Sequence, residues 1–266
     1  MEKNNLKKEV FNHWNKASCG TEVTQKPKYS KDYFEEIEQF RYKIEPEIFS
    51  FAQFTRLKDK KVLEVGIGAG SDFLQWVRSG AIAYGIDLTQ EAIDNVTNRL
   101  NLYNLNTEDL RVADAENLPY ESNFFDLVYS WGVIHHSPDT KKCLEEIVRV
   151  TKNSGKIKIM IYNRHSLFAF YRWVKTALLK GKIFRSFKDV LFYDQESLGT
   201  KAYTFKEVKN LIKDLPVKLI SIKAMVSSHD LLYYKSKPVR LIAYFLAFLF
   251  GYNRVGWFLT IELEKI

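Results

Sequence analysis

The chain has 266 residues, of which 46% are hydrophobic and 27% charged; this composition is typical of a globular protein with a sizeable core and argues against a disordered chain. The formal net charge of +8 fits either attraction to anions or a lysine-rich surface. The two cysteines, Cys19 and Cys143, lack the spacing of metal ligands, so the sequence predicts neither a disulfide framework nor a metal site. The first ten residues have no apolar signal-peptide core, which favours a cytoplasmic location.

The first 58 residues predict a helical cap. Ser30 is a suitable N-cap residue, and Pro46 interrupts the helical pattern that follows it. Three helices are expected, over about 6–14, 31–44 and 46–57. Large aromatic residues are concentrated in this segment, and packing between helices accounts for them.

From residue 59 onward, strands and helices alternate, which predicts an α/β fold with a Rossmann-like, seven-stranded, mostly parallel sheet and helices on both faces. The expected strands are 61–65, 81–87, 110–113, 125–130, 155–161, 217–223 and 257–264. The expected helices begin at Ser71 or cover 89–100, 139–150, 166–183 and 204–215. We expect one domain over 59–266, with insertions at about 164–203 and 226–254.

A glycine-rich turn follows the first strand and opens the next helix. Its glycines, Gly66, Gly68 and Gly70, allow a tight turn and the close approach of a ligand, and the free N–H groups of the helix that follows can bind a polar group. A nucleotide-like cofactor is therefore expected here. The spacing is G-x-G-x-G, and Ser71 stands where a dinucleotide-binding fold has its third glycine.

Polar residues stand at the ends of four expected strands. Glu64 ends the first strand and Asp87 the second, Asp114 follows the third, and Ser130 ends the fourth. Ligands of open α/β sheets bind at the carboxyl ends of the strands, so these residues predict one binding crevice. Each carboxylate alone could be a surface or capping group, but three at successive strand ends favour a ligand site.

Four motifs in this order resemble those of class I S-adenosylmethionine-dependent methyltransferases, of the subgroup that includes ubiquinone, menaquinone and natural-product enzymes. They read Glu64-Val65-Gly66-Ile67-Gly68-Ala69-Gly70, then Asp114-Ala115-Glu116-Asn117-Leu118-Pro119-Tyr120, then Phe125-Asp126-Leu127-Val128, then Gly132-Val133-Ile134-His135-His136. The resemblance covers roughly 61–161 and is weak elsewhere.

The resemblance implies that S-adenosylmethionine is the cofactor and S-adenosylhomocysteine the product. The implied cofactor residues are Glu64, Gly66, Gly68 and Gly70 at the amino-acid part, Asp87 at the ribose, Leu88, Asp114 and Ala115 at the adenine, and Ser130 at the end of the fourth strand. It also implies that the helical cap, with its aromatic residues, closes over the cofactor and shapes the acceptor pocket.

Two adjacent histidines, His135 and His136, follow the fourth strand. A histidine can accept a proton from a phenol, enol or ammonium near neutral pH, and only one of the two is expected to face the methyl group. His135 is the first choice and His136 the second, with a packing or capping role for both as the alternative.

The insertions point to an apolar methyl acceptor. Residues 164–188 contain seven basic residues and no acid, interleaved with aromatic and aliphatic side chains, which is typical of an interfacial helix. Residues 241–250 are apolar nearly all round. Burial in a substrate lid is the first interpretation of this run; peripheral membrane contact through 166–183 or 241–250 is the alternative.

The sequence therefore predicts methyl transfer to a small, hydrophobic or aromatic acceptor, with the atom that is methylated left open. An RNA or protein methyltransferase of the same fold is the alternative, supported by the charge. A nicotinamide-dependent oxidoreductase and a non-catalytic cofactor-binding protein rank below it. Nucleic acid is disfavoured because the motifs of adenine-amino and cytosine-carbon methyltransferases are missing.

Overall fold

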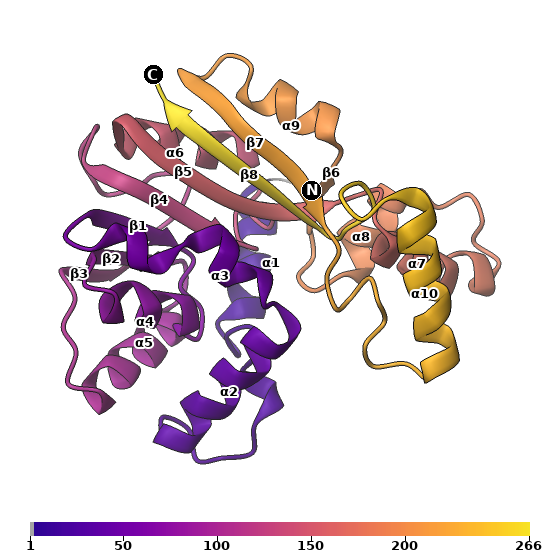
Figure 1. The fold of residues 1–266 in the computed structure, drawn as a ribbon, viewed down its shortest axis with the longest axis horizontal. Helices are drawn as coiled ribbons and strands as arrows, with labels where there is room; N and C mark the ends of the chain where they lie inside the picture. Colours follow the sequence, from indigo (N-terminus) through magenta and orange to yellow (C-terminus); the bar gives the residue numbers. More distant parts are fainter. Residues whose placement is uncertain (1–2) are drawn as a thin grey trace.

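The computed structural model describes residues 3–266, so residues 1 and 2 of the predicted cap lie outside the described residues. One central sheet organises the chain (Figure 1). Its order is β3-β2-β1-β4-β5-β8-β7, and β6 pairs with β5 off this path. The strands are β1 (Lys61–Val65), β2 (Ile82–Asp87), β3 (Asp109–Val112), β4 (Phe125–Trp131), β5 (Thr151–Asn163), β6 (Ala202–Tyr203), β7 (Val217–Met225) and β8 (Phe258–Lys265).

The predicted sheet is confirmed. Strands β1 to β5 pair in parallel, while β8 runs antiparallel to both β5 and β7. The two-residue strand β6 was not predicted, because it is too short to show a periodic pattern. Since β1 lies between β2 and β4, the carboxyl ends of these three strands meet at one edge of the sheet.

Helices cover both faces of the sheet, as predicted. Apolar side chains of α4 (Ser71–Arg78) and α5 (Gln90–Leu102) pack on one face, and those of α6 (Thr140–Val150) and α9 (Phe205–Ile212) pack on the other. Cap residues fix where these helices begin: the Thr89 hydroxyl accepts a hydrogen bond from Ala92 N at 3.3 Å.

The N-terminal helices are α1 (Lys3–Trp14), α2 (Lys31–Ile44) and α3 (Glu47–Ala52). Ser30 caps α2 through the N–H of Tyr33, as expected. The prediction of one helix over 46–57 is wrong, because Gln53 adopts a left-handed conformation with φ 59°. The helix ends there and a short 3-10 turn, η2 (Phe54–Leu57), follows. The division of the chain at residue 58 stays a prediction.

The insertions differ from expectation in their helices. The predicted helix over 166–183 ends early: α7 (Leu167–Thr176) gives way to the 3-10 turn η3 (Leu178–Lys180), and Gly181 has φ 67°. Two further helices are α8 (Phe187–Asp194) and α10 (Lys237–Phe250). Helices α7, α8 and α10 gather at one end of the molecule (Figure 1).

The interpretation of 241–250 as a buried lid is wrong. This run forms most of α10, whose buried residues are the small Ala243 and Ala247. The Phe248 side chain is 74% exposed, so the large apolar groups face outward. Across residues 3–266, no helix is both long enough and apolar enough to span a bilayer.

Candidate active site

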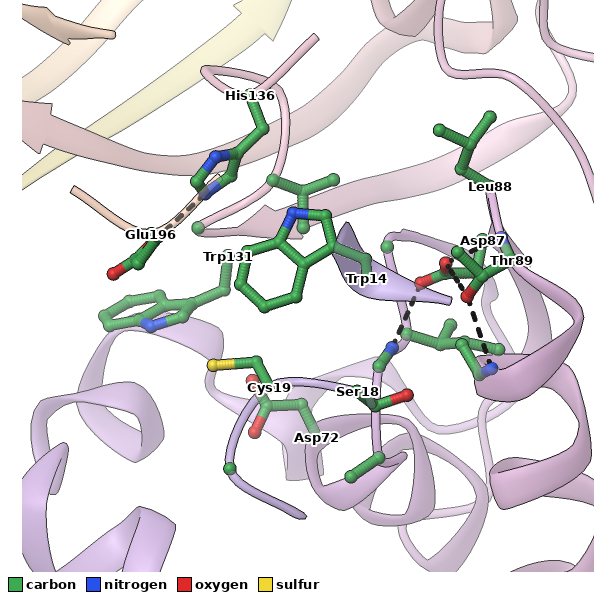
Figure 2. Close-up of a pocket in the computed structure, with 18 of the residues that line it drawn as sticks. Trp14, Ser18, Cys19, Asp72, Asp87, Leu88, Thr89, Trp131, His136 and Glu196 are labelled. Carbon is green, nitrogen blue, oxygen red and sulfur yellow. Dashed lines mark hydrogen bonds and ion pairs between the residues drawn. The ribbon is translucent and has the colours of Figure 1, made fainter. Parts of the chain in front are cut away.

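A cavity of about 750 Å³ lies at the edge of the sheet where β1, β2 and β4 end. Its wall includes most of the predicted site: Glu64, Gly66, Gly68, Gly70, Asp87, Leu88, Asp114, Ala115 and His136. Ser130 and His135 are not part of the wall. Figure 2 shows the cavity between the Asp87 loop and the His136 side chain.

The glycine turn leaves room for a ligand against the backbone. Gly68 has φ 49°, and a Cβ added there would meet no protein atom within 4 Å. At Gly66 (φ 83°), by contrast, a Cβ would lie 2.2 Å from Val133 Cγ2, so packing alone requires glycine. The space beside Gly68 is therefore a cradle that a side chain would fill.

Glu64 is the buried group at this turn whose hydrogen bonding is incomplete. Its Oε2 atom has no hydrogen-bond partner, although the residue is only 3% exposed. The neighbouring Asp72 is fully used, since Arg41 binds it through two nitrogens at 3.1 and 3.0 Å and Tyr129 donates to it at 2.9 Å. Burial, and then the nearby Asp72 carboxylate, hold the pKa of Glu64 well above its usual range. A cationic ligand group beside Oε2 would satisfy it.

Asp87 is held in place by the protein while facing the cavity. Gly68 N donates to Oδ2 at 3.2 Å, and both the N–H and the hydroxyl of Thr89 donate to Oδ1, at 3.0 and 2.9 Å (Figure 2). Burial raises its pKa, although these hydrogen bonds oppose the shift. Oδ1 already accepts two hydrogen bonds and Oδ2 accepts one, so Oδ2 keeps a lone pair for a hydroxyl group of a ligand. Leu88, the next residue, also lies in the wall.

Asp114 lies in the wall but already has a cationic partner. Lys7 of α1 binds Asp114 at 2.6 Å and Glu116 at 2.7 Å. The second Asp114 oxygen accepts the N–H of Glu116 at 2.9 Å. Helix α1 is thereby tied to the loop after β3, so the N-terminal segment forms one side of the cavity.

Ser130 and His135 are fully buried and do not belong to the cavity wall. The Ser130 hydroxyl donates to Val65 O at 3.1 Å, which links β4 to β1 and explains the residue without a ligand. His135 is fully buried, and neither ring nitrogen has a hydrogen-bond partner. Burial, together with the nearby His136 and Lys201, holds the pKa of His135 well below its usual range. The geometry does not support the first choice of His135 as the general base.

His136 faces the cavity and is paired with Glu196. Its Nε2 lies 3.3 Å from Glu196 Oε2, and its Nδ1 lies 2.9 Å from the Ser197 hydroxyl. The ring of Trp14 packs edge-on against it, with centroids 5.3 Å apart (Figure 2). Burial alone would raise the pKa of Glu196, but the hydrogen bond and charge interaction with His136 lower it overall. Glu196 is thus anionic beside a histidine.

The part of the cavity next to this pair is rich in aromatic side chains. Its members come from the N-terminal segment, from the strand ends and from the insertions. They are Trp14, Phe40, Trp131, Tyr162, Phe168, Tyr233, Trp257 and Phe258. Such a wall fits an apolar or aromatic molecule with a single polar group aimed at His136 and Glu196.

The sequence did not identify Glu196 as a site residue. Glu196 follows α8 in the first insertion, and the Tyr162 hydroxyl binds both of its oxygens at 3.0 Å. No local motif identifies it, because it is one of three acids, with Asp189 and Asp194, that follow the basic run 164–188. Trp14, for which helix packing is the first expectation and a cap over the acceptor pocket the second, lines the cavity.

Known proteins resemble the chain in its central part. A family model described as a methyltransferase domain matches residues 63–159. The ubiquinone biosynthesis O-methyltransferase of Coxiella burnetii is 29% identical over 109 residues, which are 41% of this chain and 46% of that protein. The phthiotriol/phenolphthiotriol dimycocerosates methyltransferase 1 of Mycobacterium ulcerans is 37% identical over 106 residues, 39% of this chain and 38% of that protein. The chain thus spans less than half the length of each of these relatives.

A solved structure resembles nearly the whole chain. Geranyl diphosphate C-methyltransferase from Streptomyces coelicolor, in a complex that includes S-adenosyl-L-homocysteine, superposes with a TM-score of 0.64 and covers 98% of both chains. The sequence identity is 12%, so this likeness establishes a shared fold.

Proposed function

Since residues 63–159 belong to the class I S-adenosylmethionine-dependent methyltransferases, we propose that the whole chain transfers the methyl group of S-adenosylmethionine to a small apolar or aromatic acceptor. The observation that carries this proposal is one cavity with two parts. The predicted cofactor residues stand at the strand ends, and beside them lies the part lined by aromatic side chains, which we call the aromatic chamber, where His136 is paired with Glu196.

The residues of the cavity fit the cofactor of this family. The unsatisfied Oε2 of Glu64 suits the ammonium of the methionine part, and the space beside Gly68 suits its close approach to the backbone. Asp87 keeps an Oδ2 lone pair for a ribose hydroxyl, and Leu88, Asp114 and Ala115 are the wall residues proposed to hold the adenine. When bound, S-adenosylmethionine supplies an electrophilic methyl group on a sulfonium.

The protein's main task is to align the acceptor with the methyl group and to exclude water. The aromatic chamber and α1 serve both purposes, because the side chains of Trp14 and Trp131 enclose the part of the cavity that His136 faces (Figure 2).

The pair formed by His136 and Glu196 is the proposed proton acceptor. Nδ1 of His136 faces the Ser197 and Thr200 hydroxyls and Nε2 faces Glu196, so the acceptor's hydroxyl gives its proton to a Glu196 oxygen, which passes it to Nε2. His136 then becomes a cation next to an anionic carboxylate, and this ion pair stabilises the charged state. His136 therefore replaces His135 as the proposed base. The names of the similar proteins include both O- and C-methyltransferases, so the methylated atom stays open.

The cofactor is tested by titration calorimetry of the full chain with S-adenosylmethionine and, separately, with NAD. Heat is expected with the former alone; heat with neither, or with NAD alone, overturns the proposal. The acceptor is sought by transfer of a labelled methyl group to a panel of phenols, quinols and lipids. Uptake by RNA or protein in place of these would favour the alternative of the same fold.

A further inference from the structure

Helix α10 presents large apolar side chains to the outside. The helix is held through its two small buried residues, Ala243 and Ala247, while six apolar residues on its other sides are 55% to 74% exposed. They are Leu241, Ile242, Phe245, Phe248, Leu249 and Phe250. Contiguous apolar surface of this size mostly marks an interaction site.

A second group of exposed apolar residues follows α7. Leu179 is 76% exposed and Phe184 is 96% exposed, in the segment 178–184. Helix α7 contacts α10. The ring centroid of Tyr171 in α7 lies 6.4 Å from that of Tyr234, which precedes α10. The two predicted insertions thus meet at one end of the molecule (Figure 1). We call α10 together with residues 178–184 the insertion face.

The charges within and beside the two segments of this face are mostly basic. The sequence has no acidic residue from 231 to 261, whereas basic residues stand just before α10, in its first turn and after its end. They are Lys235, Lys237, Arg240 and Arg254. Residues 175–182 add Lys175, Lys180 and Lys182, again without an acid. The next acids along the chain, Asp189 and Asp194 of α8, cap that helix and pair with Arg185, respectively. Apolar side chains flanked mainly by basic ones complement an apolar layer beneath anionic head groups.

We propose that the insertion face binds the surface of an anionic phospholipid bilayer. Helix α10 lies in the interface with its phenylalanine and leucine side chains in the acyl region, while Lys237 and Arg240 contact phosphates. A protein partner would need an apolar groove with an acidic rim that surrounds several sides of α10. A bilayer accommodates such a helix without any matching groove.

The insertion face is continuous with the aromatic chamber. Phe168 of α7 lies in the cavity wall, and so do His229 and Tyr233, which precede α10. An apolar acceptor held in the bilayer would therefore reach the cavity along α7 without crossing bulk water. This last step rests on the proposed function, but membrane binding itself does not.

The test is co-sedimentation of the full chain with vesicles of phosphatidylcholine alone and of phosphatidylcholine with about 30 mol% phosphatidylserine. Binding to the anionic vesicles is expected, and it should weaken as salt is raised. Phe245→Ser with Phe248→Ser should lower the partition coefficient at least about tenfold, since both side chains leave the acyl region. Lys237→Gln with Arg240→Gln should lower it by about 30-fold.

Matched control variants distinguish binding by the insertion face from nonspecific binding by other exposed apolar or basic residues. Leu102→Ser removes an apolar residue that is 43% exposed on α5, and Lys206→Gln with Lys209→Gln removes two exposed charges on α9. Both controls should bind vesicles like the unaltered chain. Absence of binding to anionic vesicles, or equal losses in controls and insertion-face variants, would overturn the proposal. A dimer in sedimentation velocity that Phe245→Ser with Phe248→Ser dissociates would overturn it too, by assigning the face to a second copy.

Calorimetry with S-adenosylmethionine distinguishes this proposal from the proposed function. The insertion-face variants should bind the cofactor as the unaltered chain does. Vesicle binding without cofactor binding would leave the membrane proposal standing and remove the proposed function.

Discussion

His136 Nε2 lies 3.3 Å from Glu196 Oε2, and the Tyr162 hydroxyl donates to the same carboxylate at 3.0 Å. The carboxylate comes from the first insertion and the histidine from the end of β4, so the fold of the insertion completes the pair. Its anionic state is favoured by these contacts. The pair brings a histidine and an anionic group together at the wall of the aromatic chamber.

Glu196→Gln is expected to lower kcat about 100-fold, because an amide cannot stabilise the protonated His136. Binding of S-adenosylmethionine, measured by calorimetry, should stay within about twofold, since Glu196 lies on the acceptor side of the cavity. Glu207→Gln is the matched control on α9, outside the cavity, and should leave both quantities unchanged. A kcat that Glu196→Gln does not alter would show that the acceptor needs no base.

Substitution of His136 and of His135 should affect different properties of the enzyme. His136→Asn is expected to lower kcat as Glu196→Gln does, and combining the two changes should cost little more than either alone. His135→Asn should mainly lower thermal stability, since His135 is fully buried among aromatic rings. Loss of catalysis confined to His135→Asn would reinstate His135 as the base.

Glu64→Gln is expected to stabilise the cofactor-free protein at neutral pH and to weaken cofactor binding. The pKa of Glu64 is raised on folding, so between its usual value and the raised one the native state holds more protons than the unfolded state. The stability of the unaltered chain therefore falls as pH rises above about 4.5. This fall should be smaller in Glu64→Gln, whose Tm is measured from pH 4 to 8 by calorimetry.

The same change removes the proposed partner of the cofactor's ammonium. Affinity for S-adenosylmethionine should fall about 10- to 100-fold, the range for one charged hydrogen bond. Greater stability without loss of affinity would show that Glu64 does not contact the cofactor.

Gly68→Ala tests the cradle beside the glycine turn. With φ 49° the change should cost about 1–2 kcal/mol in the free energy of unfolding, and the added methyl group would occupy the cofactor's space. Gly181→Ala is the control: its φ is 67°, its Cβ would also meet nothing within 4 Å, and it lies in the insertion. Chemical denaturation should show similar losses for both, whereas calorimetry should show lost cofactor binding for Gly68→Ala alone. Equal affinities in the two variants would place the cofactor elsewhere.

The cofactor half of the cavity could be predicted because its parts are local in sequence. Glu64 and the glycines share one turn, and Asp87 ends the adjacent strand of a parallel sheet, so strand pattern and topology bring them together. The resemblance on which their roles rested is confirmed by the family match over 63–159. Their individual contacts with the cofactor stay predictions.

The acceptor half could not be predicted, since it depends on contacts between distant segments. Glu196 reaches His136 only because the first insertion folds back, where Thr200 adds a second hydroxyl 3.1 Å from His136 Nδ1. Adjacent histidines alternate in direction, and the sequence does not say which one meets the cavity. The exposure of α10 was missed for a related reason: an all-round apolar pattern shows that a helix avoids water, but not what covers it.

Lys7→Ala should speed the release of S-adenosylmethionine about fivefold, because Lys7 ties α1 to the loop that carries Asp114. The effect is modest since the ion pairs are about one-third exposed, and pairs of this kind are worth about 1 kcal/mol or less. Lys8→Ala, at an exposed position one residue further along α1, is the control. Stopped-flow measurement of the dissociation rate at low and high salt checks the prediction: salt should reduce the difference between the two variants, because it screens the interactions that Lys7→Ala removes. Equal dissociation rates for Lys7→Ala and Lys8→Ala would mean that α1 lines the cavity without holding the cofactor in.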